Sequence, residues 1–235
     1  MSLQTLAFLT WSEFCENLKE MNPYVLWGAA AAIVLAVCFM VFANKKSGGF
    51  HWDTRLLTLG AICVALGYIL SFIKLYELPF GGSITAASML PLLAYGYMAG
   101  PLWGTIAGFV YFLLQLTQGL YFLTPLQFAL DYVVPFIVLG TLSGVFKTKN
   151  TAFNLYGGFA LAVVARYLCH FVAGFVFWGE YAADYGFNSP VLYSLVYNSF
   201  VLVDAIPCFI LISIPAIKKL FRRLPKKQKI ENAEA

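Results

Sequence analysis

Four ionisable side chains lie within long apolar segments of the sequence: Asp131, Arg166, His170 and Asp204. A charged group inside hydrocarbon is unfavourable, so each of these residues is a candidate for a functional role. Arg166 and His170 are four positions apart and therefore share one face of a helix. We expect Asp131 and His170 to line one cavity in the outer half of a membrane. Arg166 and Asp204 are expected to lie deeper and to be structural, and an Asp131–Arg166 ion pair is an alternative.

Aromatic and amide side chains gather at the level expected for Asp131 and His170. They are Tyr121, Phe122, Tyr132, Trp178, Tyr181, Tyr193, Tyr197 and Asn198. Aromatic faces attract cations, and a carboxylate neutralises a cation where the dielectric is low. The combination suits a flat, partly cationic heteroaromatic ligand. Taken singly, each aromatic residue is also typical of the belt at a membrane surface.

The elements that hold these residues are predicted to be transmembrane helices. Of the 235 residues 61% are hydrophobic and 11% are charged, against roughly a quarter charged in soluble domains. No Asp, Glu, Lys, Arg or His occurs between Leu78 and Leu130. One helix needs about 20 apolar residues to cross the hydrocarbon, so this stretch folds back at least once. The composition predicts an all-α integral membrane protein, because lipid requires internally satisfied backbone groups.

The apolar segments are interpreted as seven spans, over residues 23–43, 56–73, 83–99, 101–117, 125–146, 153–178 and 191–217. Proline and glycine separate them, with a very tight turn at Gly100-Pro101. This gives an extracellular segment over residues 1–22, an extra transmembrane helix over 23–44, a six-helix domain over 55–219 and a basic cytoplasmic tail over 220–235.

The basic residues predict the orientation of the chain in the cell membrane. In a seven-span arrangement most of them fall on one side: Lys45, Lys46, Arg55, Lys147, Lys149, Lys218, Lys219, Arg222, Arg223, Lys226, Lys227 and Lys229. Lys and Arg are retained on the cytoplasmic side of membranes. The N-terminus is therefore expected outside and the C-terminus inside.

The sequence contains no recognisable catalytic motif such as a P-loop, HExxH or GxSxG. The five cysteines form no CxxC pair. We expect no enzymatic activity, no metal, no cofactor and no nucleic-acid partner. If the protein drives transport, its energy comes from an ion gradient or from partner subunits.

Three segments resemble a known family, the thiamine-specific substrate-binding (S) components of energy-coupling factor (ECF) transporters, of the ThiT/YuaJ type. The first comprises Leu78–Thr85 and Ser88–Pro91, and the second is Tyr121–Tyr132. The third, Arg166–Ala182 continued by Tyr193–Asn198, is the most specific because ionic, aromatic and amide positions all fall in order.

The resemblance implies a six-helix core that encloses a thiamine site near the outer face. By matching position it implies ligand contacts at Tyr121, Asp131, Tyr132, His170, Gly174, Trp178, Tyr193 and Asn198. Gln127, one turn before Asp131, is expected to orient that carboxylate, and Gly174 to leave room for a ligand ring. The family docks to a transmembrane subunit, energised by two ATPase subunits, through small residues that correspond here to Ala61 and Ala65.

Two alternatives remain open at the level of sequence. Asp131 stands where some members have Glu, and Gly81-Gly82 where some have Trp. These differences favour a second hypothesis, an S component for a thiamine precursor or another vitamin. A third hypothesis is a membrane enzyme that uses Asp131 and His170 as acid and base, although the sequence offers no nucleophile or metal cluster to complete such a site.

Overall fold

The computed structural model describes residues 53–78, 82–118, 124–219 and 221. The expected segment 1–22, the extra helix 23–44, almost all of the tail 220–235 and Tyr121 lie outside these described residues.

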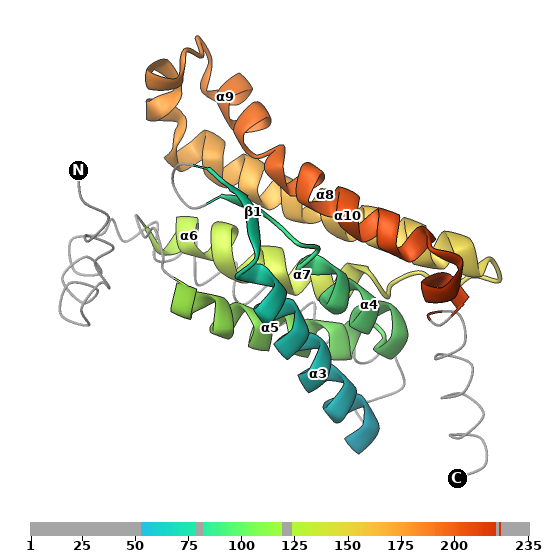
Figure 1. Ribbon diagram of the computed structural model, residues 1–235. Coiled ribbons are helices and arrows are strands. Elements are labelled where there is room, and N and C mark those ends of the chain that lie inside the picture. The colour runs from blue at the N-terminus through green and yellow to red at the C-terminus, as the bar shows by residue number, and fades with distance from the viewer. Residues whose placement is uncertain (1–52, 79–81, 119–123, 220, 222–235) are drawn as a thin grey trace.

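Within the described residues, the chain forms six helical spans and one short hairpin (Figure 1). The first three units are α3 (Thr54–Ser71), α4 (Met89–Ala99) and α5 (Pro101–Gln115), which continues into the 3₁₀ turn η2 (Leu116–Gln118). The fourth unit is continuous and consists of α6 (Pro125–Phe128), η3 (Ala129–Val133) and α7 (Val134–Leu142). The fifth is α8 (Thr151–Phe177), and the sixth is α9 (Pro190–Tyr197) with α10 (Phe200–Ser213). The 3₁₀ segment η4 (Gly179–Tyr185) joins α8 to α9, and β1 (Lys74–Glu77) pairs with β2 (Ser83–Thr85). The six-helix core expected from the sequence is therefore present.

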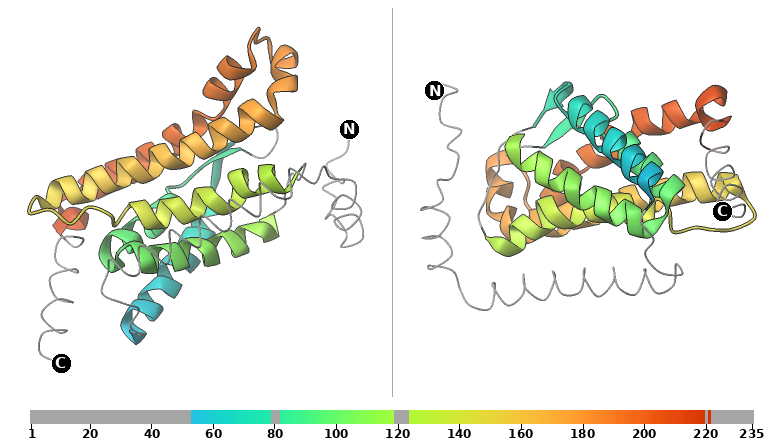
Figure 2. Two further views of the ribbon diagram at one scale, coloured as in Figure 1. Left: turned by 180° about the vertical axis from the view of Figure 1, so that it is seen from behind. Right: turned by 90° about the horizontal axis from the view of Figure 1, so that it is seen from below.

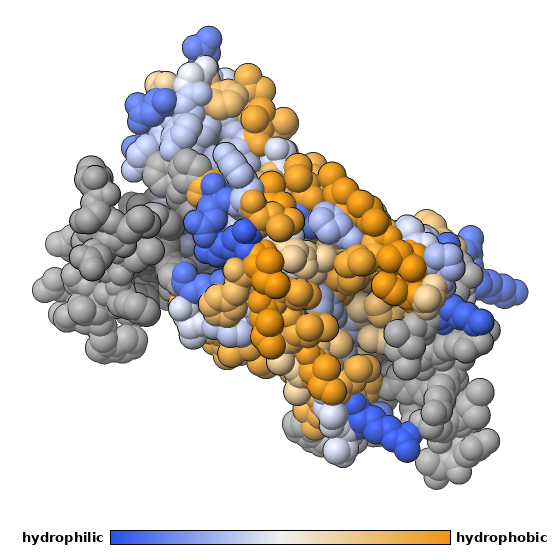
Figure 3. Space-filling view, viewed as in Figure 1, coloured by the Kyte–Doolittle hydropathy of each residue, from blue (hydrophilic) through white to orange (hydrophobic). Residues whose placement is uncertain are grey.

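Four of these units are long and apolar enough to cross a membrane: Thr54–Ser71, Pro125–Leu142, Thr151–Phe177 and Pro190–Ser213. Three of them, α3, α8 and the α9–α10 unit, carry many exposed large hydrophobic residues, including Ile62, Ile69, Ile206 and Ile210. Figure 3 shows this apolar surface along α3 and α10, with hydrophilic residues beyond its ends. The protein is thus a multi-pass membrane protein.

The third expected span, over residues 83–99, is corrected by the structure. Its first residues form β2, which pairs antiparallel with β1, and the helix α4 begins only at Met89. A helix of 11 residues rises about 16 Å, roughly half of the hydrocarbon thickness. The apolar run is continuous in sequence, but its first part forms a strand because it pairs with β1.

The hairpin is fixed to the other end of the chain by a buried carboxylate. Asp204 on α10 is 2% exposed and its Oδ1 accepts hydrogen bonds from the backbone N–H of Thr85 at 2.7 Å and from the Thr85 hydroxyl at 2.9 Å. The Thr85 hydroxyl also lies 2.7 Å from that of Ser88, next to the start of α4. Asp204 therefore has the structural role expected from the sequence.

Glycines allow α4, α5 and α7 to pack backbone against backbone. A Cβ added at Gly104 would strike the Gly140 backbone, and a Cβ added at Gly140 would strike Gly104. Gly96 on α4 has the same relation to Gly140. Small residues at such crossings let membrane helices approach closely. Gly100, with a φ of 90°, makes the tight turn between α4 and α5.

Candidate ligand-binding site

One cavity lies at the C-terminal end of α8, where α9, η3 and the hairpin meet it. Seven residues expected from the sequence line it: Asp131, Tyr132, His170, Gly174, Trp178, Tyr193 and Asn198. Gly82, Gln127, Tyr197 and Phe200 complete the lining. The structure thus brings together, around one cavity, residues that lie up to 118 positions apart in sequence, from Gly82 to Phe200.

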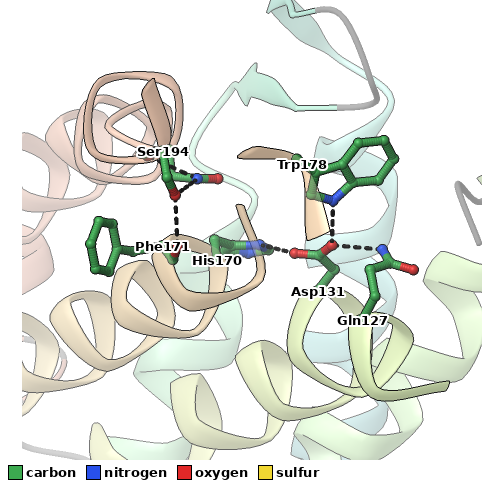
Figure 4. A network of polar contacts seen from close by, with 7 residues as sticks. Gln127, Asp131, His170, Phe171, Trp178 and Ser194 are labelled. Atoms are coloured by element: carbon green, nitrogen blue, oxygen red, sulfur yellow. Dashed lines mark hydrogen bonds and ion pairs between the residues drawn. The ribbon is translucent and has the colours of Figure 1, made fainter. Parts of the chain in front are cut away.

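Asp131 is the centre of a polar network in this cavity (Figure 4). Its Oδ2 accepts hydrogen bonds from Gln127 Nε2 at 2.6 Å and from the Trp178 indole Nε1 at 3.3 Å. Its Oδ1 lies 3.3 Å from His170 Nδ1. Gln127 itself is 1% exposed, so it is held rigidly against the carboxylate. The expectation that Gln127 orients Asp131 agrees with this geometry.

A π-helical turn aims Asp131 into the cavity. Residues Ala129–Val133 form η3, which lies between the regular helices α6 and α7. The N-terminus of α6 is capped by Thr124, whose hydroxyl accepts the Gln127 N–H. A π-turn adds a residue to the helical turn and rotates the side chains on it, and such turns are frequent at functional sites.

His170 presents a second polar atom to the site. Because its Nδ1 faces the Asp131 carboxylate, a neutral imidazole there carries its proton on Nδ1 and leaves Nε2 as an acceptor. Nε2 is buried and has no hydrogen-bond partner among the residues that the structure describes. An unpartnered buried polar atom is unfavourable, so a ligand N–H at this point would be stabilising.

Asn198, Ser194 and Gly174 form the contact between α8 and α9. The Asn198 amide donates to the Ser194 backbone oxygen at 2.9 Å and lies 3.1 Å from its hydroxyl, while Ser194 Oγ donates to the Phe171 carbonyl at 2.6 Å (Figure 4). A Cβ at Gly174 would lie 2.5 Å from both Asn198 Nδ2 and Ser194 Oγ. Gly174 also lines the cavity, and the expectation that it leaves room for a ligand ring stays a prediction.

An aromatic wall faces the polar network. Tyr193 is 2% exposed and its ring contacts those of Tyr185, Phe187 and Tyr197 at centroid distances of 5.6 to 5.8 Å. The centre of the Phe200 ring lies 5.9 Å from the centre of the His170 ring. Of these rings, Tyr193, Tyr197 and Phe200 offer apolar and π surfaces to the cavity.

The Asp131–Arg166 ion pair considered from sequence is wrong. Among the described residues, the Asp131 carboxylate contacts the imidazole of His170 and not the guanidinium of Arg166. Arg166 instead places its guanidinium 5.1 Å from the centre of the Phe136 ring, a cation–π contact, and does not line the cavity.

Four lining residues were not among the expected ligand contacts. One is Gln127, which was expected to orient Asp131, and the other three are Gly82, Tyr197 and Phe200. The spacing of Tyr193, Tyr197 and Phe200 is i, i+4 and i+7, which places all three on one helical face and could have identified the last two. Gly82 directly precedes β2, and residue spacing alone does not predict that the β1–β2 pairing places it at the cavity.

Comparison with known proteins decides the family. The family described as "Thiamine transporter protein (Thia_YuaJ)" matches residues 57–222. The chain belongs to this thiamine transporter family. Its members are transporters, so the expectation that the chain is not an enzyme is confirmed and the membrane-enzyme hypothesis is set aside.

Individual members of the thiamine transporter family resemble the chain over most of its length. Thiamine transporter ThiT of Bacillus subtilis is 31% identical over 186 residues, which cover 70% of this chain and 94% of that protein. ThiT of Lacticaseibacillus paracasei is 31% identical over 156 residues, covering 60% of this chain and 73% of that protein. The solved structure of ThiT from Listeria monocytogenes superposes with a TM-score of 0.57 at 31% identity, covering 72% of this chain and 99% of that one.

Proposed function

We propose that this protein binds thiamine at the cavity around Asp131 and delivers it into the cell as the S component of an ECF transporter. The observation that carries the proposal is the Asp131 carboxylate, held by Gln127, His170 and Trp178 at the edge of an aromatic-lined cavity within the membrane. A buried carboxylate beside aromatic faces suits a flat monocation. Two relatives that resemble most of the chain are named thiamine transporters.

Each polar group has a counterpart on thiamine, which combines a positively charged thiazolium with an aminopyrimidine. Asp131 lies near the thiazolium charge, and His170 Nε2 accepts from the exocyclic amino group. Both hydrogen bonds of the Asn198 amide use its Nδ2, so its Oδ1 is the atom that accepts from the pyrimidine edge. Tyr132 and Tyr193 contact the rings, and Tyr121, outside the described residues, is proposed to complete the wall.

Ligand entry requires Trp178 to move. The cavity has a volume of about 80 Å³, whereas small-molecule pockets begin at roughly 300 Å³. Trp178 is the C-cap of α8, at the border of a helix and the 3₁₀ segment η4, and its indole donates to the carboxylate that the cation needs. In the proposed cycle the thiazolium replaces this indole at Asp131, and the indole then stacks on a ligand ring.

Uptake is energised by a partner transmembrane subunit and two ATPase subunits. The proposed docking surface is the face of α3 that carries Ala61 and Ala65, which are both exposed and one turn apart. Small exposed residues let a partner helix approach closely. The N-terminus is proposed outside and the C-terminus in the cytoplasm, because Lys147, Lys149 and Lys218 lie at the end of the bundle opposite the site.

Thiamine titration of the full chain in detergent tests the binding proposal. Calorimetry is expected to give saturable 1:1 binding, accompanied by quenching of tryptophan fluorescence. Trp178→Phe should remove most of the quenching, whereas Trp103→Phe, a buried residue of the α5 core outside the cavity lining, should retain it. Absence of binding at micromolar thiamine would refute the proposal.

A second candidate ligand is a thiamine precursor or another vitamin. The short Asp131 side chain, and Gly81-Gly82 where some members have Trp, favour it. Thiamine, its isolated pyrimidine and riboflavin should be titrated in parallel. Tighter binding of either of the last two than of thiamine would establish this alternative, while a preference for thiamine would exclude it.

A further inference from the structure

A second, apolar groove lies on the membrane-facing side of the protein, between α8 and α10. These two helices contact one another and run side by side in Figure 1 and in the left view of Figure 2. The groove has a volume of about 590 Å³ and is lined by Ala160, Val163, Val164, Leu202, Ala205, Ile206, Phe209, Ile210 and Ser213. Among the described residues that line it, Ser213 alone carries a hydroxyl, and it lies at one end.

That end of the groove is closed by a polar bridge and carries a cation. The hydroxyls of Tyr156 on α8 and Ser213 on α10 lie 3.3 Å apart. The ammonium of Lys218 sits 5.0 Å from the centre of the Tyr156 ring, a cation–π contact that holds the charge at the mouth of the groove. A negatively charged group placed here would meet Lys218 and a hydroxyl together.

The length of the groove matches one leaflet of a bilayer. From Ser213 to Leu202, α10 rises about 16 Å at 1.5 Å per residue. The hydrocarbon core is about 30 Å thick, so the groove reaches from one membrane surface to about the midplane. A transmembrane partner helix would need a contact surface across the full thickness, whereas an acyl chain ends near the midplane.

We propose that this groove is a binding site for one anionic phospholipid, with an acyl chain between α8 and α10 and its phosphate at Lys218. Basic pockets at the ends of transmembrane helices bind the head groups of anionic lipids. The lipid belongs to the leaflet on the side of Lys147, Lys149 and Lys218. It would bind at the opposite end of α8 from the Asp131 cavity.

Native mass spectrometry of the full chain, released from nanodiscs of equal phosphatidylglycerol and phosphatidylcholine content, tests the proposal. The wild-type protein should retain one phosphatidylglycerol with at least about tenfold preference over phosphatidylcholine. Lys218→Glu should abolish that preference. Lys149→Glu makes the same charge change at an exposed residue of the same end and should leave it intact.

Groove filling provides an independent arm. Val164→Trp should prevent retention of the lipid, because Val164 lines the groove and is 46% exposed. Val172→Trp is the matched control on the same helix, since Val172 is 42% exposed and lies outside the groove. Ile206→Trp repeats the test from α10 should the Val164 variant lose its helical circular dichroism.

Three results would overturn the proposal. The first is equal retention of both lipids by the wild-type protein. The second is the same loss in Lys149→Glu as in Lys218→Glu, which would indicate nonspecific attraction to the basic end. The third is retention of lipid only after removal of residues 1–44, which would indicate that this segment of the chain occupies the groove instead.

Discussion

Gly174→Ala is the most direct probe of how α9 is held against α8. The added Cβ would lie 2.5 Å from both Asn198 Nδ2 and Ser194 Oγ, so one or both side chains must move. Overpacking of this kind costs about 1–3 kcal/mol, and replacing a helical glycine by alanine returns up to about 1 kcal/mol. The expected net result is destabilisation by about 1–2 kcal/mol, measured as a lower midpoint of thermal unfolding in detergent.

The same substitution should weaken the proposed thiamine binding. Displacement of Asn198 removes a hydrogen bond to the ligand, which contributes about 0.5–1.5 kcal/mol. With 1.4 kcal/mol for each factor of ten, the dissociation constant should rise roughly 2- to 12-fold, as measured by calorimetry.

Gly157→Ala is the matched control on the same helix. A Cβ at Gly157 would make only ordinary contacts, 3.5 Å from the rings of Phe146 and Phe153. Its unfolding midpoint should stay unchanged or rise, and its thiamine affinity should equal that of the wild-type protein. If Gly174→Ala were as stable and bound thiamine as tightly as Gly157→Ala, the reasoning about this contact would be refuted.

Other substitutions test the remaining parts of the proposal. Asp131→Asn should weaken thiamine binding at least about 100-fold by calorimetry, since a charge pair 4–5 Å apart contributes about 3–4 kcal/mol at an effective dielectric of 20; a loss that is equal for thiamine and its neutral pyrimidine would contradict a role in charge recognition. Ala61→Trp should abolish uptake by cells that contain the energising subunits while calorimetric affinity is unchanged, and uptake at wild-type rates would exclude this face of α3 as the docking surface. Thr85→Val should lower stability by about 1–3 kcal/mol in thermal unfolding because it removes the hydroxyl donor to buried Asp204; the exposed Thr58→Val is the control. To test the orientation, a reporter enzyme that is active only in the cytoplasm and one that is active only outside the cell should each be fused to the C-terminus. Only the cytoplasmic reporter should be active.

The sequence predicted well those features that depend on local spacing. Arg166 and His170 could be placed on one helical face, and the apolar runs located most of the helices, because helical period and bilayer thickness act on neighbouring residues. The convergence of Asp131, His170, Trp178 and Asn198 on one cavity agrees with the resemblance drawn from the second and third segments.

Features that depend on distant contacts were not predictable in the same way. Ser83–Thr85 lies in an uncharged, apolar part of the sequence that predicts a transmembrane helix. It is a strand because it pairs with β1 and because Thr85 hydrogen-bonds to Asp204, 119 residues away. The π-turn that aims Asp131 has no signature in residue type. The indole of Trp178 could be placed near the site, but its hydrogen bond to Asp131 depends on where α8 ends.

The crossing of α4, α5 and α7 has a consequence for selection experiments. In a library of single variants selected for thiamine uptake, substitutions at Gly104 and Gly140 should be depleted as strongly as those at Asp131, because any side chain at either glycine strikes backbone. Selection alone would therefore report two sensitive regions, of which one contacts no ligand. Protein abundance in the membrane would separate them, since loss of Gly140 removes the folded protein and loss of Asp131 leaves it in place.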